Sequence, residues 1–232
     1  IITEAMLSYF IDKVCGRARF FKPEVMVCIP SGVTQVEKRA VFDATLAAGA
    51  RDVYLIEEPL AAAIGAKIPI AQAAGHMILD SGGGTSDIAV ISLGGVVVHK
   101  SIRYAGNKLE EAIANYIRKR FNLLVGERTA EEIKISIGTA IPDTRNPKTL
   151  EVKGRDSVSG LPRSVTISEV EASDAIQPIL KLMVGAIKEV FEMTPPELAS
   201  DIIDKGIVLS GGTCMLRKLD VYITTETGVP SY

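Results

Sequence analysis

A glycine-rich turn between two apolar stretches is the part of the sequence best suited to chemistry. Residues 80–87 read DSGGGTSD, with three consecutive glycines at 82–84. Glycines let the backbone turn sharply and bring several N–H groups close to one anion, and phosphate is the natural guest of such a loop. Asp80 is placed to hold Mg²⁺, usually through waters, and the hydroxyl of Thr85 adds a donor. The alternative is an ordinary glycine-rich hairpin flanked by polar residues. The turn matches neither the Walker A pattern, because no GK[ST] follows, nor the GxGxxG dinucleotide pattern.

A second glycine turn lies near the end of the sequence, where residues 209–214 read LSGGTC between an expected strand and an expected helix. The N–H groups at a helix start suit a phosphate, and small residues let a flat base or a ribose approach the backbone. Taken alone, this pattern is more typical of a structural turn. The two glycine turns together predict two walls of one cleft.

A pair of carboxylates, Glu57 and Glu58, precedes Pro59 at the junction of an expected strand and an expected helix. Acidic residues in a first helical turn interact favourably with the helix dipole, so a structural role is one interpretation. A positioned base or a water-orienting group is the other. His76 and His99 have no adjacent carboxylate or cysteine pattern, and we expect neither to be a ligand or part of a Ser–His–Asp arrangement.

Strand and helix patterns alternate along the first third of the chain, which predicts α/β layers. The expected elements there are a helix over residues 1–15 with Ile2, Met6, Phe10 and Val14 on a buried face, a buried strand at 25–29, a helix after Thr34 capped with Glu37, a strand at 53–56 and a helix at 60–66.

From residue 76 onward, three β-rich stretches joined by glycine turns predict an antiparallel meander. The later expected elements are a helix at 107–121, a helix capped by Thr129 with Glu132, a small β-hairpin unit at 141–163, a helix at 168–193 interrupted by Pro178, a short helix from Pro195, a strand at 206–209 and a helix at 215–227.

The composition is that of a folded chain, since 47% of the 232 residues are hydrophobic and 23% are charged. The net charge of -2 gives no broad attraction to nucleic acid, which is therefore not an expected partner. Three cysteines without CxxC spacing argue against a disulfide framework or a zinc site and fit a reducing cytoplasm. No apolar run approaches the roughly 20 residues that span a bilayer.

Five long stretches closely resemble the MreB family of rod-shape-determining bacterial actins, and they occur in the family's order: PEVMVCIPSGVTQVEKRA, VYLIEEPLAAAIGA, LDSGGGTSDIAVISLGG, GERTAEEIKISIG and TPPELASDIIDKGIVLSGG. The resemblance implies an actin-like ATPase fold of the α/β class, with ribonuclease H-like lobes and a small α+β subdomain, here in partial form. Residues 1–75 correspond to part of the first lobe, 76–117 and 171–232 to the second lobe, and 118–170 to the small subdomain. ATP and Mg²⁺ are expected in the cleft.

The resemblance also implies roles for single residues. Residues 80–85 correspond to the family's second phosphate loop, with Asp80 near the metal, and Glu58 corresponds to the acid that orients the attacking water. The residues implied as catalytic are Glu58, Asp80 and Thr85, and those implied as nucleotide-binding are Gly82, Gly83, Gly84, Thr85, Glu131, Glu132, Ile133, Lys134, Gly211, Gly212, Thr213 and Cys214. Ser81, Asn107, Thr213 and Cys214 depart from the family's usual residues, which bears on affinity.

The family's first phosphate loop, the small subdomain beside it and its membrane-binding element have no counterpart in these residues. We therefore expect the later two thirds of a longer protein, and expect these residues alone to bind Mg-ATP weakly or not at all. The longer protein is expected to hydrolyse ATP and to form filaments of itself in the cytoplasm, at the inner membrane surface, together with the cell-wall elongation machinery.

Three other functions remain open at this point. A sugar or acetate kinase of the same superfamily shares the two-lobe cleft but needs a base for the acceptor hydroxyl, and only Glu58 is a candidate. A chaperone-type ATPase shares the EPxAAA and GGGT patterns, but the chain has no peptide-binding domain. The third alternative is an inactive, truncated product.

Overall fold

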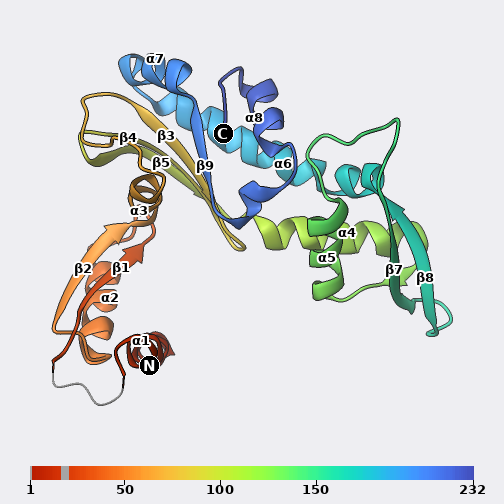
Figure 1. Cartoon of the computed structure of the whole chain (residues 1–232), viewed down its shortest axis with the longest axis horizontal. Coiled ribbons are helices and arrows are strands. Elements are labelled where there is room, and N and C mark those ends of the chain that lie inside the picture. Colours follow the sequence, from red (N-terminus) through yellow and green to blue (C-terminus); the bar gives the residue numbers. More distant parts are fainter. Residues whose placement is uncertain (1, 17–20) are drawn as a thin grey trace.

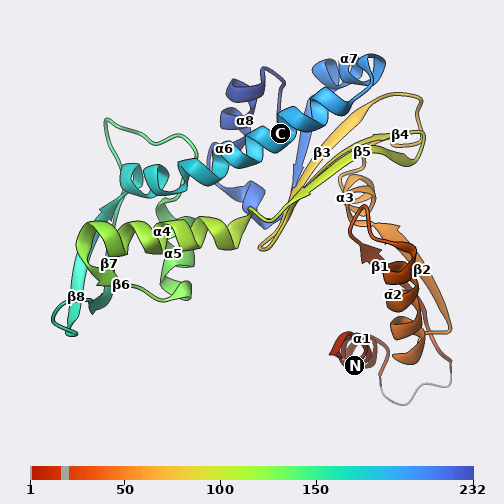
Figure 2. The same ribbon diagram turned by 180° about the vertical axis from the view of Figure 1, so that it is seen from behind.

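The computed structural model describes residues 2–16 and 21–232, so the first residue of the helix expected at 1–15 lies outside the described part. Three sheets run along the elongated molecule (Figure 1). They are a parallel pair of β1 (Glu24–Ile29) and β2 (Asp52–Glu57), a central sheet in the order β5-β4-β3-β9, and a small sheet in the order β6-β7-β8. Seen from behind, the first and third sheets again lie at opposite ends of the molecule (Figure 2). This mixed architecture confirms the predicted α/β class.

The central sheet contains the predicted meander. Strands β3 (His76–Ser81), β4 (Ser86–Ser92) and β5 (Gly95–Ile102) pair antiparallel in sequence order. The fourth strand, β9 (Ile207–Ser210), lies parallel to β3 with Asp80 opposite Ser210. Because parallel neighbours end at the same edge of a sheet, the two glycine turns that follow β3 and β9 lie side by side. They are neighbours at one edge of the central sheet, and Gly82, Gly83, Gly212 and Thr213 line the same cavity.

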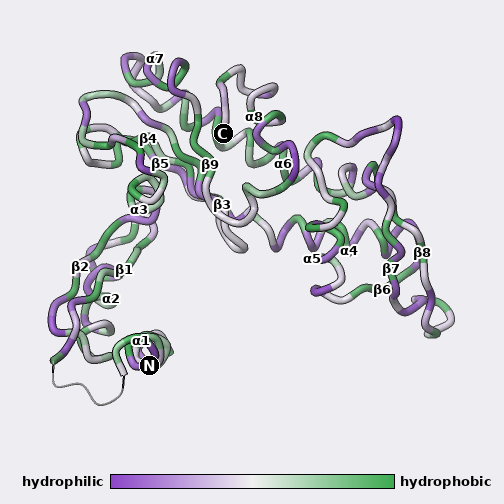
Figure 3. Tube along the Cα trace, in the orientation of Figure 1, coloured by the Kyte–Doolittle hydropathy of each residue, from purple (hydrophilic) through white to green (hydrophobic). Residues whose placement is uncertain are grey.

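The core forms on both faces of this sheet, as the alternation of side chains along β3 requires. Met77 and Leu79 join a large cluster that includes buried residues of α4 (Gly106–Phe121) and α6 (Glu169–Met193). Ile78 points to the other face and packs with Ala63 of α3 (Glu58–Gly65). The strands of the central sheet accordingly carry mostly hydrophobic residues (Figure 3). Their burial gives the glycine turns a rigid base.

The first lobe is less buried than the sequence predicted. Helix α1 (Ile2–Cys15) forms, but its expected apolar face is exposed, with Ile2 and Val14 at 87% and 84% accessibility, and Ile11 is its buried residue. The reason is that α1, in the part of the chain that the structure describes, packs chiefly against α2 (Gln35–Ala47) rather than against a sheet. Strand β1 is also half-exposed, with only Ile29 buried. The predicted capping box of Thr34 and Glu37 is confirmed at the start of α2.

The segment expected to form the small subdomain contains α5 (Glu127–Ile137) and the strands β6 (Leu123–Leu124), β7 (Thr149–Asp156) and β8 (Pro162–Ser168), which make up the third sheet. The predicted hairpin is present, and β7 and β8 pair over their full length. The predicted capping box of Thr129 and Glu132 is wrong, because the N-cap of α5 is Gly126, three residues earlier. Gly126 can take the extended backbone of an N-cap at little cost, so the helix starts there.

Two other predictions fail in the last third of the chain. Helix α6 runs without a break through Pro178, although Ser168 caps it as predicted and forms a capping box with Glu171. The helix expected at 215–227 is divided into a 3-10 turn, η1 (Gly212–Met215), and α8 (Leu219–Thr227). Lys218 lies between them in the left-handed region at φ 58°, which ends one helix and redirects the chain into the next. Helix α7 (Pro196–Lys205) starts at the predicted proline pair.

Within residues 2–16 and 21–232, no helix has both the length and the apolar character that a membrane crossing requires.

Candidate functional site

A cavity of about 560 Å³ lies at the edge of the central sheet where β3 and β9 end. Its walls come from the two glycine turns, the first turns of α4, one face of α5 and the segment after η1. The lining residues are Gly82, Gly83, Gly106, Asn107, Glu110, Glu131, Lys134, Ile135, Gly138, Gly212, Thr213, Met215, Leu216 and Arg217. This volume is typical of small-ligand sites.

The first glycine turn is held by the start of α4. The carbonyl oxygen of Gly82 accepts hydrogen bonds from Gly106 N (3.1 Å) and from Thr213 Oγ1 (2.7 Å). Asn107 N donates to the carbonyl of Gly83 (2.9 Å). Among the described residues, the N–H groups of Gly83, Gly84 and Thr85 donate to no protein acceptor. Three successive unpaired N–H groups form a concave, partly positive surface that suits an anion.

The second glycine turn touches the first so closely that a side chain is excluded. Gly211 has φ +90°, and a Cβ placed on it would lie 2.3 Å from the carbonyl oxygen of Ser81. Gly212 and Thr213 line the cavity, but Cys214 does not. The Cys214 thiol packs against the main core cluster, and burial raises its pKa to about 12. It is a neutral packing group at neutral pH.

Helix α5 presents only part of the predicted motif to the cavity. Glu131 and Lys134 line it, and Lys134 Nζ pairs with Glu110 Oε1 of α4. The structure does not bring Ile133 there, because this residue is fully buried in the core. Glu132 faces a separate, smaller cavity against β7. The spacing of an α-helix explains this division, since 131, 134, 135 and 138 share one face.

Three carboxylates, Glu58, Asp80 and Asp87, act on one another beside the glycine turn, and none of them lines the 560 Å³ cavity. Asp80 of β3 lies directly opposite Asp87 of β4 in the antiparallel ladder, and Glu58 is the first residue of α3. Burial raises the pKa of Glu58, and the negative charges of Asp87 and Asp80 raise it further. A carboxylate with a raised pKa binds protons more tightly and is a better hydrogen-bond acceptor for a water molecule.

These carboxylates do not form a metal cage by themselves. In the described part of the chain, no group of three or more His, Cys, Asp or Glu side chains is placed to hold a metal ion. Mg²⁺ commonly binds through one or two carboxylates together with phosphate oxygens and waters. The donor set at Asp80 therefore fits a nucleotide-bound Mg²⁺ rather than a metal held by protein alone.

Several residues around the cavity were not found from the sequence. Ile135 and Gly138 lie on the same helical face as Glu131 and Lys134, so the helical spacing in the sequence could have predicted their place in the cavity. Gly106 and Glu110 depend on α4 crossing to the glycine turn, which local patterns do not show. Asp87 is the last residue of the motif at 80–87 and is only 5% exposed. Its place at the end of that motif was the signal that the sequence offered.

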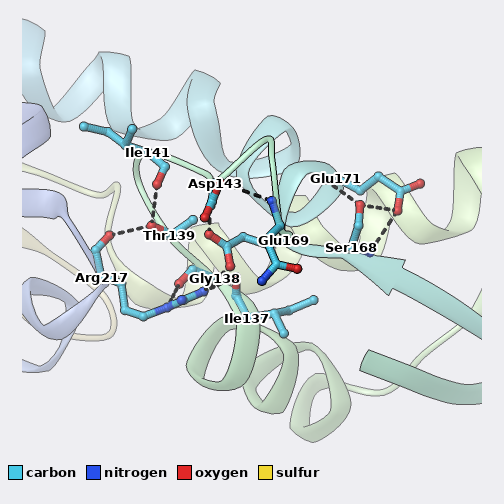
Figure 4. A network of polar contacts seen from close by, with 10 residues as sticks. Ile137, Gly138, Thr139, Ile141, Asp143, Ser168, Glu169, Glu171 and Arg217 are labelled. Atoms are coloured by element: carbon cyan, nitrogen blue, oxygen red, sulfur yellow. Dashed lines mark hydrogen bonds and ion pairs between the residues drawn. The ribbon is translucent and has the colours of Figure 1, made fainter. Parts of the chain in front are cut away.

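Arg217 ties the cavity to the small subdomain (Figure 4). Its guanidinium donates to the carbonyls of Ile137 (2.8 Å) and Gly138 (3.0 Å) at the end of α5. The same group donates to Glu169 Oε2 at the start of α6 (3.2 Å). Glu169 is buried, and its Oε1 accepts a hydrogen bond from Asp143 N (3.1 Å). One side chain therefore joins three separate segments at the cavity wall.

Replacing Glu169 with Ala is expected to reduce the free energy of unfolding by about 2 kcal/mol or more. The change leaves the half-buried Arg217 without its carboxylate and Asp143 N without its acceptor. Burial raises the pKa of Glu169, but the hydrogen bonds from Asp143 N and Arg217 outweigh it, so the net pKa is lowered. The stabilisation is thus present above the unfolded pKa and is lost as pH falls through the folded one.

The measurement is urea unfolding of wild type and Glu169→Ala at pH 7 and at pH 3. The matched control is Glu226→Ala, whose exposed pair with Lys188 spans 3.9 Å and is worth well under 1 kcal/mol. A loss no larger than that of the control, or a loss that persists unchanged at pH 3, would contradict the role given to Glu169.

Comparisons with known proteins agree with this architecture. The chain matches the family described as MreB/Mbl protein over residues 1–232. It is 46% identical over 229 residues to the cell shape-determining protein Mbl of Bacillus subtilis (strain 168), covering 99% of this chain and 68% of that protein. It is 48% identical over 231 residues to the cell shape-determining protein MreB of Escherichia coli (strain K12), covering 99% and 66%.

Among solved structures, the crystal structure of MreB5 of Spiroplasma citri bound to ADP matches with a TM-score of 0.92 and 36% identity. The match covers 99% of this chain and 68% of that one. The chain therefore spans about two thirds of the length of these relatives.

Proposed function

Because the chain belongs to the MreB/Mbl family, we propose that it is an ATP-binding subunit of an actin-like, cell shape-determining filament. The observation that carries the proposal is the glycine turn at residues 82–85. Gly82 and Gly83 line the cavity of about 560 Å³, Gly84 and Thr85 follow beyond its lining, and the N–H groups of Gly83, Gly84 and Thr85 have no acceptor among the described residues. A phosphate chain needs such donors, and a nucleoside needs a cavity of this size. The relative from Spiroplasma citri, which was crystallised with ADP, supports the same assignment.

In this proposal the cavity divides into two parts. The phosphates lie against Gly82, Gly83, Gly84 and Thr85, and the nucleoside lies between α5 and the second glycine turn. Lys134 pairs with Glu110 at this wall, and Glu131 and Gly212 complete it. Thr213 acts indirectly, because its hydroxyl donates to Gly82 and thereby positions the phosphate turn.

The proposed reaction is hydrolysis of ATP at the three carboxylates. Asp80 would hold a Mg²⁺ ion bound with the nucleotide, and that ion would supply positive charge to offset the phosphates. Glu58 orients the attacking water, and its raised pKa makes it a ready acceptor for the water proton. Phosphoryl transfer depends mainly on positioning and electrostatics, so a single well-placed acceptor of this kind has a large effect on rate.

Filament formation is part of the same proposal. Nucleotide state controls assembly of copies of this chain, in the cytoplasm and at the inner membrane surface, where the filament organises the cell-wall elongation machinery. The support is family membership and the names of the cell shape-determining relatives. The same membership favours a filament subunit over a metabolite kinase or a chaperone-type ATPase.

Replacing Gly83 with Val tests the nucleotide site. A Cβ on Gly83 would lie 2.9 Å from Asn107 Oδ1, the end of a side chain that can move, so the fold should survive. The branched side chain would block the phosphate turn, and we expect Mg-ATP affinity to fall at least about 100-fold through the lost N–H contacts. The measurement is calorimetric titration of the protein as the cell makes it, with light scattering to follow assembly.

The matched control is Gly95→Val at the start of β5, where the nearest atom to a new Cβ is 3.9 Å away. Valine is well suited to a strand, and this position lies outside the cavity lining. Normal Mg-ATP affinity in Gly83→Val would remove the turn from the site, whereas equal losses in both variants would point to a general folding effect.

A further inference from the structure

Arg217 joins two walls of the cavity of about 560 Å³. One wall consists of the second glycine turn and the segment that follows it, to which Arg217 itself belongs. The other wall is the cavity face of α5, a helix that ends at Ile137. The side chain of Arg217 reaches from the first wall to the end of the second (Figure 4). The space between these walls is called the nucleoside slot below, because the proposed function places the nucleoside there.

The main chain of Arg217 holds the segment just beyond α5. Its carbonyl oxygen accepts hydrogen bonds from Ala140 N (2.8 Å) and from Thr139 Oγ1 (3.0 Å), and Thr139 forms a parallel β-bridge with Arg217. These contacts use no side-chain atom of Arg217, so they persist when that side chain is replaced. They attach the chain at one point and leave the helix before it free to tilt.

The side chain of Arg217 holds the end of the helix itself. Its Nη2 atom donates to the carbonyl of Ile137 in the last turn (2.8 Å), and Nε donates to the carbonyl of Gly138, the C-cap (3.0 Å). Carbonyl groups at a helix C-terminus lack partners within the helix and carry partial negative charge, so a guanidinium suits them. Because its donors lie in one rigid plane, the guanidinium fixes both the distance and the direction of the helix end.

Glu169 keeps the guanidinium in this orientation. Its Oε2 atom accepts a hydrogen bond from Arg217 Nη2 (3.2 Å), and its Oε1 atom accepts one from Asp143 N (3.1 Å). Glu169 is only 3% exposed, and a buried carboxylate with both oxygens bonded has little freedom to move. The position of Arg217 is therefore set by the protein before any ligand binds.

The nucleoside slot offers an exposed apolar side chain from each wall. Ile135 of α5 and Met215 of η1 line the cavity, although they are 69% and 84% exposed. Such side chains favour an apolar ring as ligand over a charged group. The phosphate turn at residues 82–85 receives none of the hydrogen bonds that the Arg217 side chain donates within the described residues. Arg217 thus acts on the nucleoside side of the cavity.

We propose that Arg217 sets the width of the nucleoside slot and is a positioning residue for the nucleoside part of the nucleotide. It acts through α5, whose cavity face carries Glu131, Lys134 and Ile135. A change at Arg217 alters the fit of the nucleoside and leaves the phosphates in place. This inference rests on the proposed function, because it takes the phosphates to lie at the glycine turn.

Two ligands separate the nucleoside from the phosphates. ADP and pyrophosphate each carry two phosphates, and ADP alone carries a nucleoside. Their magnesium complexes are titrated by calorimetry into the protein as the cell makes it, as wild type and as Arg217→Lys. Lysine keeps a positive charge beside Glu169, but its single ammonium group cannot hold both carbonyls in one plane. We expect the affinity for Mg-ADP to fall about 10-fold and that for Mg-pyrophosphate to change less than about 2-fold.

The matched control is Arg163→Lys, the same replacement at an ion pair with Asp156 outside the cavity lining. This variant should bind both ligands as wild type does. If Arg217→Lys does not fold, Glu169→Gln serves instead, because it keeps the side-chain size and removes the charge that orients the guanidinium. Glu169→Gln should lower the affinity for Mg-ADP by about 3-fold and leave that for Mg-pyrophosphate unchanged.

The outcomes separate this inference from the proposed function. Wild type that binds Mg-ADP, with an Arg217→Lys variant that loses both affinities by the same factor or loses neither, overturns the role of Arg217 and leaves the nucleotide site intact. Wild type that binds neither ligand overturns the proposed function, and the role of Arg217 with it. A loss confined to Mg-ADP, absent from Arg163→Lys, is the result expected, because a general structural role would not distinguish the two ligands.

Discussion

Glu58→Gln is expected to slow ATP hydrolysis by about 100-fold while leaving ATP affinity nearly unchanged. Glutamine keeps the size of the side chain but removes the negative charge that accepts the water proton, and general-base catalysis is typically worth at least this factor. The phosphates remain held by the glycine turn and the metal by Asp80. Filaments should therefore form with ATP and then fail to turn over, because in this proposal disassembly follows hydrolysis.

Stability gives an independent readout of the same residue. If Glu58 only interacted with the dipole of α3, its loss would cost a few tenths to about 1 kcal/mol. The raised pKa of Glu58 predicts instead that loss of its charge increases the stability of the fold. A carboxyl group whose pKa is higher in the folded state favours folding below its unfolded pKa and disfavours it as pH rises through the folded value. At pH 7, Glu58→Gln should therefore be slightly more stable than wild type.

The measurements are phosphate release, ATP affinity and thermal unfolding on the protein as the cell makes it. Glu57→Gln is the matched control, because Glu57 is the adjacent carboxylate and accepts a hydrogen bond from Ser31 Oγ (2.9 Å) outside the three-carboxylate group. We expect normal phosphate release in this control. Unchanged release in Glu58→Gln, at unchanged affinity, would return Glu58 to a structural role at the start of α3.

Gly211→Ala is expected to have the largest effect on stability. Alanine there would adopt φ +90°, which L-residues rarely do, and its Cβ would lie 2.3 Å from the Ser81 carbonyl oxygen and 2.9 Å from Asp80 Oδ1. Backbone strain alone costs about 1–3 kcal/mol, and neither β3 nor β9 can move away, because they are paired in one sheet. A total of about 3 kcal/mol corresponds to a fall in Tm of roughly 6–12 °C for a chain of this size.

The neighbouring glycine provides the control for this prediction. A Cβ on Gly212 would have no atom within 4 Å, and Gly212 has no positive φ. Gly212→Ala should therefore shift the Tm of the nucleotide-free protein by no more than an ordinary surface change. A similar fall in Tm for both variants would mean that the loop as a whole is sensitive to substitution, and that the contact between the two glycine turns is not the cause.

The elements that the sequence predicted correctly have local causes. Thr34 with Glu37 and Ser168 at the start of α6 are caps, and a cap depends on residues within one turn of each other. The predictions that failed depend on packing. Whether the apolar face of α1 is buried depends on what lies against it, and Pro178 is tolerated inside α6 because tertiary contacts along the helix stabilise it.

The candidate site shows the same division. The glycine turns could be found because three consecutive glycines, or a pair after a strand, are informative in themselves. The side-by-side position of the two turns could not be found from the sequence, because it depends on the pairing of β9 with β3, two strands far apart in the chain. Gly106 and Glu110 were missed because their approach to the cavity is set by the angle at which α4 leaves the sheet. The catalytic and binding roles remain predictions that the variants above test.

The pairing of β9 with β3 also affects how the chain folds during its synthesis. Met77 lies opposite Ile207, so the partner of β3 is made 130 residues later. At about 5–20 residues per second, a ribosome needs roughly 7–26 s to produce that partner. During this time β3, whose residues Met77, Ile78 and Leu79 are apolar, has one unpaired edge, a template for wrong strand pairing. The phosphate turn can therefore reach its final shape only late in synthesis, and protection of the nascent strand should determine the yield of folded protein.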